Sequence, residues 1–236
     1  MSTWDTILTP HPGGAGEPPL AELRVVVGNA WDLVVDAFRL RSDGLEVLEQ
    51  YLNPGTIFFV CYAGDHVVGA TSWIPDGPYG LPADHVHRPA IDDLRAAGRV
   101  TENGPVIVAD ACRALTRDIA LRVFAAGACR VGDFETLTAR VAPRDQPFYA
   151  DVAGFVPHAG TPSSGLMSLS AAQLEGTRRA PAHPYQRRLS ELSLGWSSWL
   201  ETRIDSGAQM RYRIGELLAA RELGGTVAST GEPHVA

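Results

Sequence analysis

Apolar residues recur along this chain with two different spacings, separated by breaks rich in Pro, Gly and Asp. Continuous β-rich runs predict strands, and apolar residues three or four positions apart predict amphipathic helices. In the first part of the chain this pattern predicts a strand at 23–27, helices at 31–40 and 44–52, and a β-hairpin formed by 56–62 and 66–74 around a tight turn at 63–65.

The same alternation continues beyond residue 75. It predicts a loop at 75–90, a short helix at 91–97, a buried strand at 104–109, an amphipathic helix at 113–126, a strand at 134–141, a short helix bearing Tyr149, and strands at 155–158 and 165–169. Strands that alternate with helices predict an α/β (α+β) fold. We expect one twisted mixed sheet with helices on both faces.

The ends of the chain follow different patterns. Residues 1–20 are rich in Pro and Gly and are expected to be irregular. Residues 21–175 are expected to form the folded domain, and 181–225 a helical extension. Residues 185–222 read as wholly helical, with an apolar stripe that packs on the domain or forms a homodimer contact; its members are Leu189, Leu192, Trp196, Trp199, Leu200 and Ile204.

Composition excludes several classes of protein. The chain has no lysine, and all 20 of its basic residues are arginine, so it lacks the lysine that phosphate-loop NTPases and pyridoxal-phosphate enzymes require. The motifs H-E-x-x-H and G-x-S-x-G are also missing. A net charge of −7 with scattered arginines indicates neither nucleic acid nor membrane as a partner. With no secretory signal, no apolar run of about 20 residues and three cysteines without paired spacing, a cytoplasmic location is expected.

Two stretches carry a family resemblance. Residues 133–155 read as a strand, a polar break, a helix with Phe148-Tyr149 and a turn at Gly154-Phe155, which resembles the thioester site of the GNAT superfamily of N-acyltransferases. Residues 80–82 (Gly-Leu-Pro), 94–99 (Leu-Arg-Ala-Ala-Gly-Arg) and Glu102 resemble its N-acyl amino acid synthase branch, which is related to the acyl-homoserine-lactone synthases. The resemblance covers roughly residues 56–158. It implies a GNAT-like fold and transfer of an acyl group from acyl carrier protein to an amine.

Acyl transfer to an amine needs a base, a polarised carbonyl and an acid for the leaving thiolate. The resemblance implies Glu102 as the base, directly or through water; alternatively it is a solvated loop carboxylate. Tyr149 is implied as the acid, with a core aromatic residue as the alternative. Backbone N–H groups of Val106, Ile107 and Val108 are expected to bind the donor's pantetheine arm. Pro105 has no N–H, so its position is lost to the strand ladder or marks a bulge.

The donor is expected to be a phosphopantetheine thioester, with no permanently bound cofactor. Residues 110–116 contain no glycine, and Asp110 would repel a phosphate, so a CoA pyrophosphate site is not expected there. Arg113 and Arg117 are candidates for binding one phosphate. A donor carried by acyl carrier protein would need a basic docking face, drawn from Arg113, Arg117, Arg122, Arg178, Arg179, Arg187 and Arg188.

The acceptor or acyl pocket is expected to draw on residues 73–87. Trp73 and Tyr79 are candidates to line it, with core or loop packing as the alternative. His85 and His87 form an H-x-H pair, which on a strand would share a face; no further ligands lie nearby in sequence, so no metal site is expected. Two other functions stay open: a CoA-dependent acetyltransferase with a degenerate phosphate loop, and a non-catalytic module that binds an acyl ligand or a partner.

Overall fold

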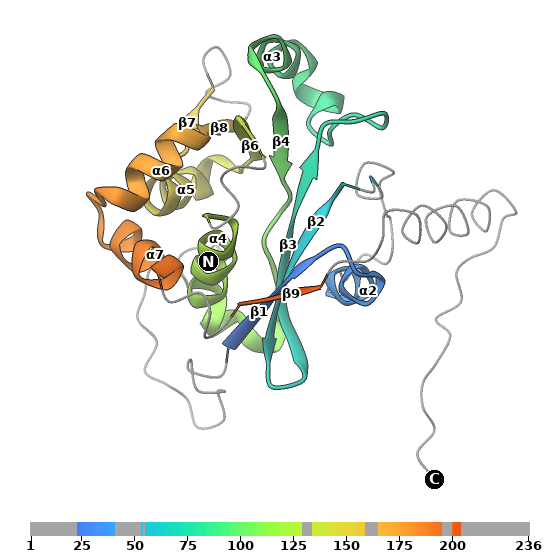
Figure 1. Ribbon diagram of the computed structural model, residues 1–236, viewed down its shortest axis with the longest axis vertical. Helices are drawn as coiled ribbons and strands as arrows, with labels where there is room; N and C mark the ends of the chain where they lie inside the picture. Colours follow the sequence, from blue (N-terminus) through green and yellow to red (C-terminus); the bar gives the residue numbers. More distant parts are fainter. Residues whose placement is uncertain are drawn as a thin grey trace, which may run out of the picture.

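The computed structural model describes residues 23–40, 53, 55–128, 134–158, 165–194 and 200–203. Their strands form one mixed sheet in the order β7-β8-β6-β4-β3-β2-β1-β9, with β5 beside β3 (Figure 1). The strands are β1 (Leu23–Gly28), β2 (Ile57–Ala63), β3 (His66–Pro75), β4 (Val100–Asn103), β5 (Ile107–Val108), β6 (Thr136–Arg140), β7 (Val156–Pro157), β8 (Leu166–Ser170) and β9 (Leu200–Arg203).

Helices cover both faces of this sheet, as the sequence predicted. One face carries α2 (Trp31–Arg39) and α3 (Asp84–Ala97). The other carries α4 (Thr116–Ala128), α5 (Gln146–Ala153), α6 (Ala171–Arg179) and α7 (Pro184–Leu194). Two short 3-10 helices, η3 (Asp110–Leu115) and η5 (Pro143–Asp145), lead into α4 and α5. None of the helices described is long and apolar enough to cross a bilayer.

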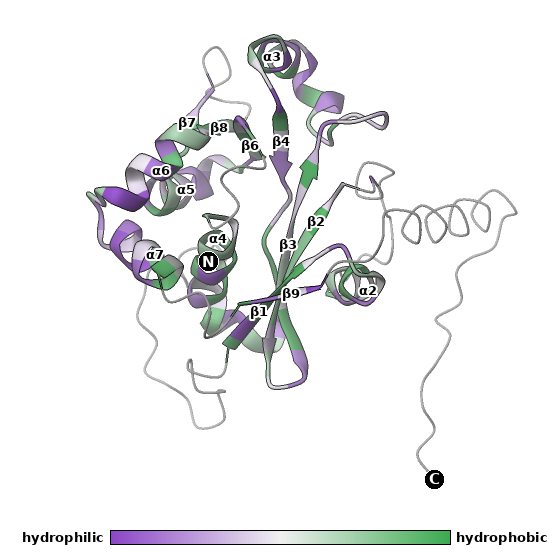
Figure 2. Cartoon of the chain, viewed as in Figure 1, coloured by the Kyte–Doolittle hydropathy of each residue, from purple (hydrophilic) through white to green (hydrophobic). Residues whose placement is uncertain are grey.

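Alternating side chains of the central strands build a separate core on each face. Val26 and Phe58 point toward α2, whereas Val27 and Phe59, one residue along in each strand, point toward α4. This is the two-residue period of a strand that is buried on both sides. The hydropathy colouring shows these apolar residues along the strands and on the inward sides of the helices (Figure 2).

Most predicted elements are present within one to three residues of their expected bounds, namely β1, α2, the β2–β3 hairpin, α4, β6, α5, β7 and β8. The loop predicted for 75–90 is wrong, because α3 already begins at Asp84. The helix bends at His87 (φ −125°, ψ 27°), which puts Pro89 in the first turn of the piece that follows. A proline is tolerated there because the N–H it lacks would have no helical partner.

Two further expectations need correction. The strand predicted for 104–109 is divided, since pairing runs from Val100 to Asn103 and resumes only at Ile107–Val108. The prediction of continuous helix over 185–222 fails at Leu200–Arg203, which form β9 in parallel with β1. Helix α7 ends at Leu194, and its Leu189 and Leu192 are buried in the chain's own core. The predictions for 1–20, 44–52 and 204–222 lie outside the described residues.

Candidate active site

The sheet opens between two parallel strands near its middle. β4 pairs with β6 from Val100↔Thr136 to Asn103↔Ala139. Beyond that point β5 pairs only with β3, and β6 continues its pairing with β8 on its other side. In α/β sheets, ligands bind at such openings outside the carboxyl ends of parallel strands. The opening is therefore the first place to look for a functional site.

A one-residue bulge produces this opening. The stretch from Asn103 to Ile107 has one residue more than the stretch of β3 that it faces, from Ala70 to Trp73. The extra residue is held in place by hydrogen bonds, since the Gly104 carbonyl accepts from the Thr71 hydroxyl (2.9 Å) and the Asn103 side-chain amide (2.8 Å). The Gly104 N–H donates to the Ser72 carbonyl at 2.7 Å. Position 105 thus lies in a bulge, one of the two alternatives that its proline predicted.

Strand geometry decides which N–H groups face the opening. The N–H of Ala109 donates to the Val68 carbonyl in β3 at 2.9 Å. Because successive N–H groups of a strand point to opposite sides, that of Ile107 also faces β3, whereas those of Val106 and Val108 face away from it. Of the three N–H groups expected to bind the donor arm, two therefore lie on the side of the opening.

Glu102 lies in β4 one residue before the opening, on the face covered by α3. Its side chain is almost fully buried, with 1 % of the residue's surface exposed. The Ala83 N–H donates to Oε2 at 2.7 Å, and Arg140 Nε donates to Oε1 at 3.0 Å. Burial raises the pKa of this carboxyl, while the Arg140 charge and the Ala83 N–H act in the opposite direction. Glu102 is therefore not a solvated loop carboxylate.

Arg140 also lies close to His87. Burial and the Arg140 charge both lower the pKa of His87, which keeps the imidazole neutral over a wider range of pH. His85 and His87 lie in helix α3 and not on a strand, where they would have shared a face. His87 is buried, and His85 lines an open cavity. Among the described residues no group of His, Cys, Asp or Glu could hold a metal ion.

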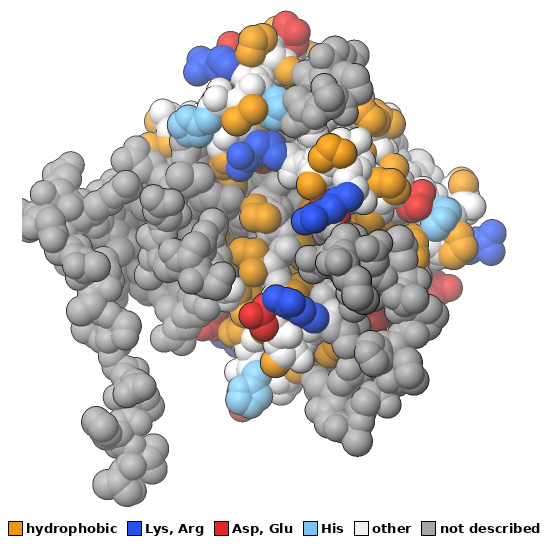
Figure 3. Space-filling model, turned by 180° about the vertical axis from the view of Figure 1, so that it is seen from behind, with side chains coloured by type: hydrophobic (Ala, Val, Ile, Leu, Met, Phe, Trp, Pro, Cys, Tyr) orange, Lys and Arg blue, Asp and Glu red, His pale blue; other side chains and the backbone are white. Residues whose placement is uncertain are grey.

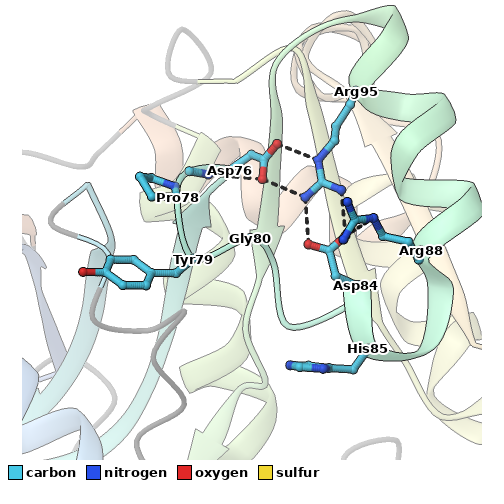
Figure 4. Close-up of a pocket in the computed structure, with 9 residues that line it drawn as sticks. Asp76, Pro78, Tyr79, Gly80, Asp84, His85, Arg88 and Arg95 are labelled. Atoms are coloured by element: carbon cyan, nitrogen blue, oxygen red, sulfur yellow. Dashed lines mark hydrogen bonds and ion pairs between the residues drawn. The ribbon is translucent and has the colours of Figure 1, made fainter. Parts of the chain in front are cut away.

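A polar cavity of about 490 Å³ lies at the start of α3 (Figure 4). Its walls include two predicted residues, Tyr79 and His85. The complete lining is Asp76, Gly77, Pro78, Tyr79, Gly80, Asp84, His85, Arg88 and Arg95. Figure 4 shows the Arg95 guanidinium between the carboxylates of Asp76 and Asp84, with the Tyr79 ring turned away from them.

Trp73 lies elsewhere. Its ring packs between Phe59 and Phe134 in the core on the α4 face, with centroid distances of 5.2 and 5.1 Å. Its indole N–H donates to Asn103 Oδ1 at 3.0 Å. The structure therefore places Trp73 on the opposite face of the sheet from the cavity, where it supports the strand that leads into the bulge.

Tyr149 lies in α5 on the α4 face. Its ring packs edge-on against Phe124 (5.4 Å between centroids) and Phe155 (5.5 Å), and 5 % of the residue is exposed. Burial is the main cause that raises the pKa of the phenol, and the Asp145 charge adds to it. Glu102 and Tyr149 thus lie on opposite faces of the sheet.

The arginines predicted to bind a phosphate or to form a docking face differ in burial and in their ion-pair partners. Arg113 Nη2 forms an ion pair with Asp110 Oδ1 at 2.8 Å on the exposed surface of η3. The side chain of Arg117 lies outside the described set. Arg122 is buried, so it does not belong to a docking face. Arginines are scattered over the surface shown in Figure 3 rather than gathered in one patch, and Arg178, Arg179 and Arg188 pair with neighbouring glutamates.

Sequence reasoning missed three residues that shape the site. Arg140 and Arg95 are the partners of Glu102 and of the cavity carboxylates, and Asp145 is a buried carboxylate next to Tyr149. Two of them left a signal in the sequence. Arg95 lies in the Leu-Arg-Ala-Ala-Gly-Arg stretch at 94–99, and Asp145 lies four residues before Tyr149, which is one helical turn.

The sequence of this chain matches a known protein family. The family model described as N-acyl amino acid synthase FeeM matches residues 33–168, which is more than half of the chain. The chain belongs to this family. It is accordingly an N-acyltransferase, and its fold is GNAT-like. The non-catalytic alternative therefore falls away.

Several solved structures are similar to this chain, and the first named here supports the fold. One is FeeM, an N-acyl amino acid synthase from uncultured soil microbes, with 17 % identity and a TM-score of 0.51 over 65 % of this chain and 93 % of that chain. Another is BjaI, a CoA-dependent acyl-homoserine lactone synthase, with 18 % identity and a TM-score of 0.49 over 80 % of this chain and 99 % of that chain. A search of curated proteins found no match.

Proposed function

We propose that this family member transfers an acyl group from a phosphopantetheine thioester to the amine of an amino acid or small amine. The opening between β5 and β6 is the observation that carries the proposal. A pantetheine arm is narrow and extended, and it fits between two strands that separate after Asn103↔Ala139. The outward N–H groups of Val106 and Val108 would hydrogen-bond the arm and polarise the thioester carbonyl.

The reaction then proceeds by direct attack. Glu102, acting directly or through a water, takes a proton from the acceptor ammonium, and the free amine attacks the thioester carbonyl carbon. A C–N bond forms, the C–S bond breaks, and the Tyr149 hydroxyl gives its proton to the departing thiolate. As the tetrahedral intermediate collapses, the attacking nitrogen loses a second proton, and Tyr149 regains its proton through solvent. The proton on Glu102 is released to solvent, so that the ammonium and the thioester give an amide, a free thiol and one proton. The raised pKa of Glu102 suits this role, because a base with a pKa nearer neutrality removes a proton more effectively.

Acyl carrier protein is the donor that the region before α4 favours. A CoA pyrophosphate is held best by free N–H groups at a helix start. Here the 3-10 helix η3 precedes α4, and the Asp110 carboxylate pairs with Arg113 at the surface. The Asp110 carboxylate therefore neutralises Arg113, which keeps little attraction for a pyrophosphate. CoA with a weakly bound pyrophosphate stays the second candidate.

The acceptor is proposed to enter through the cavity at the start of α3. The cavity lies on the same face of the sheet as Glu102, and Ala83, whose N–H binds Glu102, directly precedes its lining residue Asp84. Tyr79 and His85 would contact the acceptor there. Asp76 and Asp84 are paired there with Arg95, so the charges that line the cavity are largely balanced.

Mass spectrometry of the products tests the proposal. The protein is supplied with a panel of amines and amino acids, and with the same acyl group on carrier protein or on CoA. We expect an N-acylated product, formed faster from the carrier-protein thioester. Equal or higher kcat/KM with acyl-CoA, together with loss of affinity when the 3′-phosphate is removed, would select CoA as the donor. No acylated amine with either donor would refute the proposed function.

A further inference from the structure

Asp145 is a buried carboxylate that the proposed reaction does not use. Only 8 % of the residue is exposed, and its Oδ1 atom has no hydrogen-bond partner among the described residues. Its ion-pair partner is Arg144, whose Nε lies 3.7 Å from Oδ1, too far for a hydrogen bond, on a side chain that is 62 % exposed. A buried, unsatisfied acceptor is costly, so its presence calls for an explanation.

Asp145 also lacks the usual role of an aspartate at its position. It is the N-cap residue of α5, where an aspartate normally accepts a hydrogen bond from an N–H of the first turn. Here the side chain makes no such bond. The carboxylate therefore satisfies none of the N–H groups of that first turn.

The fold places this carboxylate beside the opening. The strands on either side of the opening run parallel, and each leads at its carboxyl end into a helix on the same face: β5 through η3 into α4, and β6 through η5 into α5. Asp145 is the last residue of η5. Tyr149 follows one turn later, about 6 Å along the helix axis, and the charge of Asp145 acts on the Tyr149 phenol.

We infer that Asp145 Oδ1 binds the donor arm by accepting a hydrogen bond from its cysteamine amide N–H. This inference rests on the proposed function. With Tyr149 at the departing sulfur, that amide is the polar group of the arm nearest to the thioester, because only two methylene groups separate it from the sulfur. Asp145 lies on the face from which the sulfur is protonated, whereas the acceptor is placed on the opposite face with Glu102.

A pair of small donors isolates this contact. One is an acyl thioester of N-acetylcysteamine, and the other carries an ester oxygen in place of the amide N–H. The native protein should prefer the amide by about 10- to 100-fold in kcat/KM, as expected of a hydrogen bond to a charged group. Asp145→Ala should reduce this preference to about 1, and Asp145→Asn, which keeps a neutral acceptor, should give an intermediate ratio.

Asp151→Asn is the matched control, since Asp151 lies on the same helix but is partly exposed and only loosely paired with His183 (3.9 Å). The preference of Asp151→Asn for the amide donor should equal that of the native protein.

Binding can be compared without turnover by using the corresponding S-alkyl thioethers. The ratio of their dissociation constants should show the same pattern. An unchanged preference in Asp145→Ala, or no preference in the native protein, overturns the inference. Binding with the expected ratios but no turnover of any donor would instead refute the proposed function alone.

Melting temperature gives a second readout. A carboxylate kept for ligand binding costs stability in the free protein, so Asp145→Asn should melt higher than the native protein without donor. A lower melting temperature would identify Asp145 as a structural residue and overturn the inference.

Discussion

Burial raises the pKa of both Glu102 and Tyr149, and the two shifts have different consequences for the proposed reaction. A higher pKa makes the Glu102 carboxylate a stronger base. The same direction of shift makes the Tyr149 phenol a weaker acid, so its proposed role depends on its position beside the departing thiolate, a strong proton acceptor, and not on the pKa shift. The apolar surroundings therefore favour the proposed role of Glu102 but not that of Tyr149.

Glu102→Gln is expected to lower kcat by about 10²- to 10³-fold, because an amide cannot take the proton from the ammonium. In the native protein kcat/KM should fall as the pH decreases through the raised pKa of Glu102, since the base is then protonated. This acidic limb should be missing in the variant. A pH–rate profile checks both points, and an acidic limb that persists in Glu102→Gln would contradict the assignment.

Tyr149→Phe is expected to lower kcat by about 10²-fold while the fold is kept, because the ring packing against Phe124 and Phe155 does not involve the hydroxyl. Release of the free thiol can be followed directly. Tyr185→Phe is the control, since Tyr185 packs against Phe148 on the same side of the sheet. Equal activity of the two variants would remove Tyr149 from the mechanism.

At the residue scale, the sequence identified the side chains whose spacing is local and missed those whose partners are distant. Tyr149 could be located from the helix and the Gly154-Phe155 turn that follow each other directly. Arg140 could not be identified as the partner of Glu102, because the pair is separated by 38 residues in sequence and depends on the parallel register of β4 and β6. For Trp73 the structure shows core packing, the alternative to a place in the pocket, and the sequence could not decide between them because β3 is buried on both sides.

Among the elements, α3 depends on a group of ion pairs that the sequence does not reveal. All three nitrogens of the Arg95 guanidinium donate to carboxylates. Nε and Nη2 donate to Asp76, and Nη1 and Nη2 donate to Asp84. Asp84 Oδ2 also accepts from the Leu81 N–H at 2.7 Å. These contacts fix the turn at 80–83, and that turn carries the Ala83 N–H that binds Glu102. The four prolines and two glycines of 75–90 predicted a loop, and ion pairs that would oppose this prediction cannot be inferred from composition.

Asp84→Asn should lower the free energy of unfolding by about 1–2 kcal/mol, because it weakens a largely buried contact with Arg95. The Arg95 guanidinium holds the pKa of Asp84 below its ordinary value. The ionised carboxylate therefore stabilises the fold above that ordinary pKa, and this contribution is lost as the pH falls through the lowered value.

Urea unfolding at several pH values measures the difference between the native protein and Asp84→Asn. Asp92→Asn is the control, because Asp92 binds the same arginine from a more exposed position. Its effect should be smaller. A destabilisation by Asp84→Asn that does not shrink on acidification would show that the charge of Asp84 is not what stabilises the turn.

The order of the strands separates the candidate site from the edge of the sheet at the scale of the whole molecule. The opening lies between β5 and β6, whereas β9 lies at the far edge, beside β1. Three ion pairs accompany β9: Arg24 with Glu201, and Arg203 with Asp32 and with Glu201. The helical pattern of residues 185–222 gave no sign of this strand, because a parallel pairing across more than 170 residues leaves no local periodicity.

Gly28→Ala tests how far the edge strand supports the rest of the fold. Gly28 faces Arg203 in the β1–β9 ladder, and a Cβ at this position would collide with the Arg203 carbonyl oxygen. The backbone of β9 would have to move away, at a cost of about 1–3 kcal/mol. Urea unfolding should show this loss, while kcat/KM stays near that of the native protein because the opening is several strands away.

The control is Gly176→Ala in α6, where a Cβ meets no atom within 4 Å. It should leave stability unchanged or raise it by up to about 1 kcal/mol. A Gly28→Ala variant as stable as the native protein would mean that β9 contributes little to the sheet, and a parallel loss of activity would mean that the edge and the site are coupled.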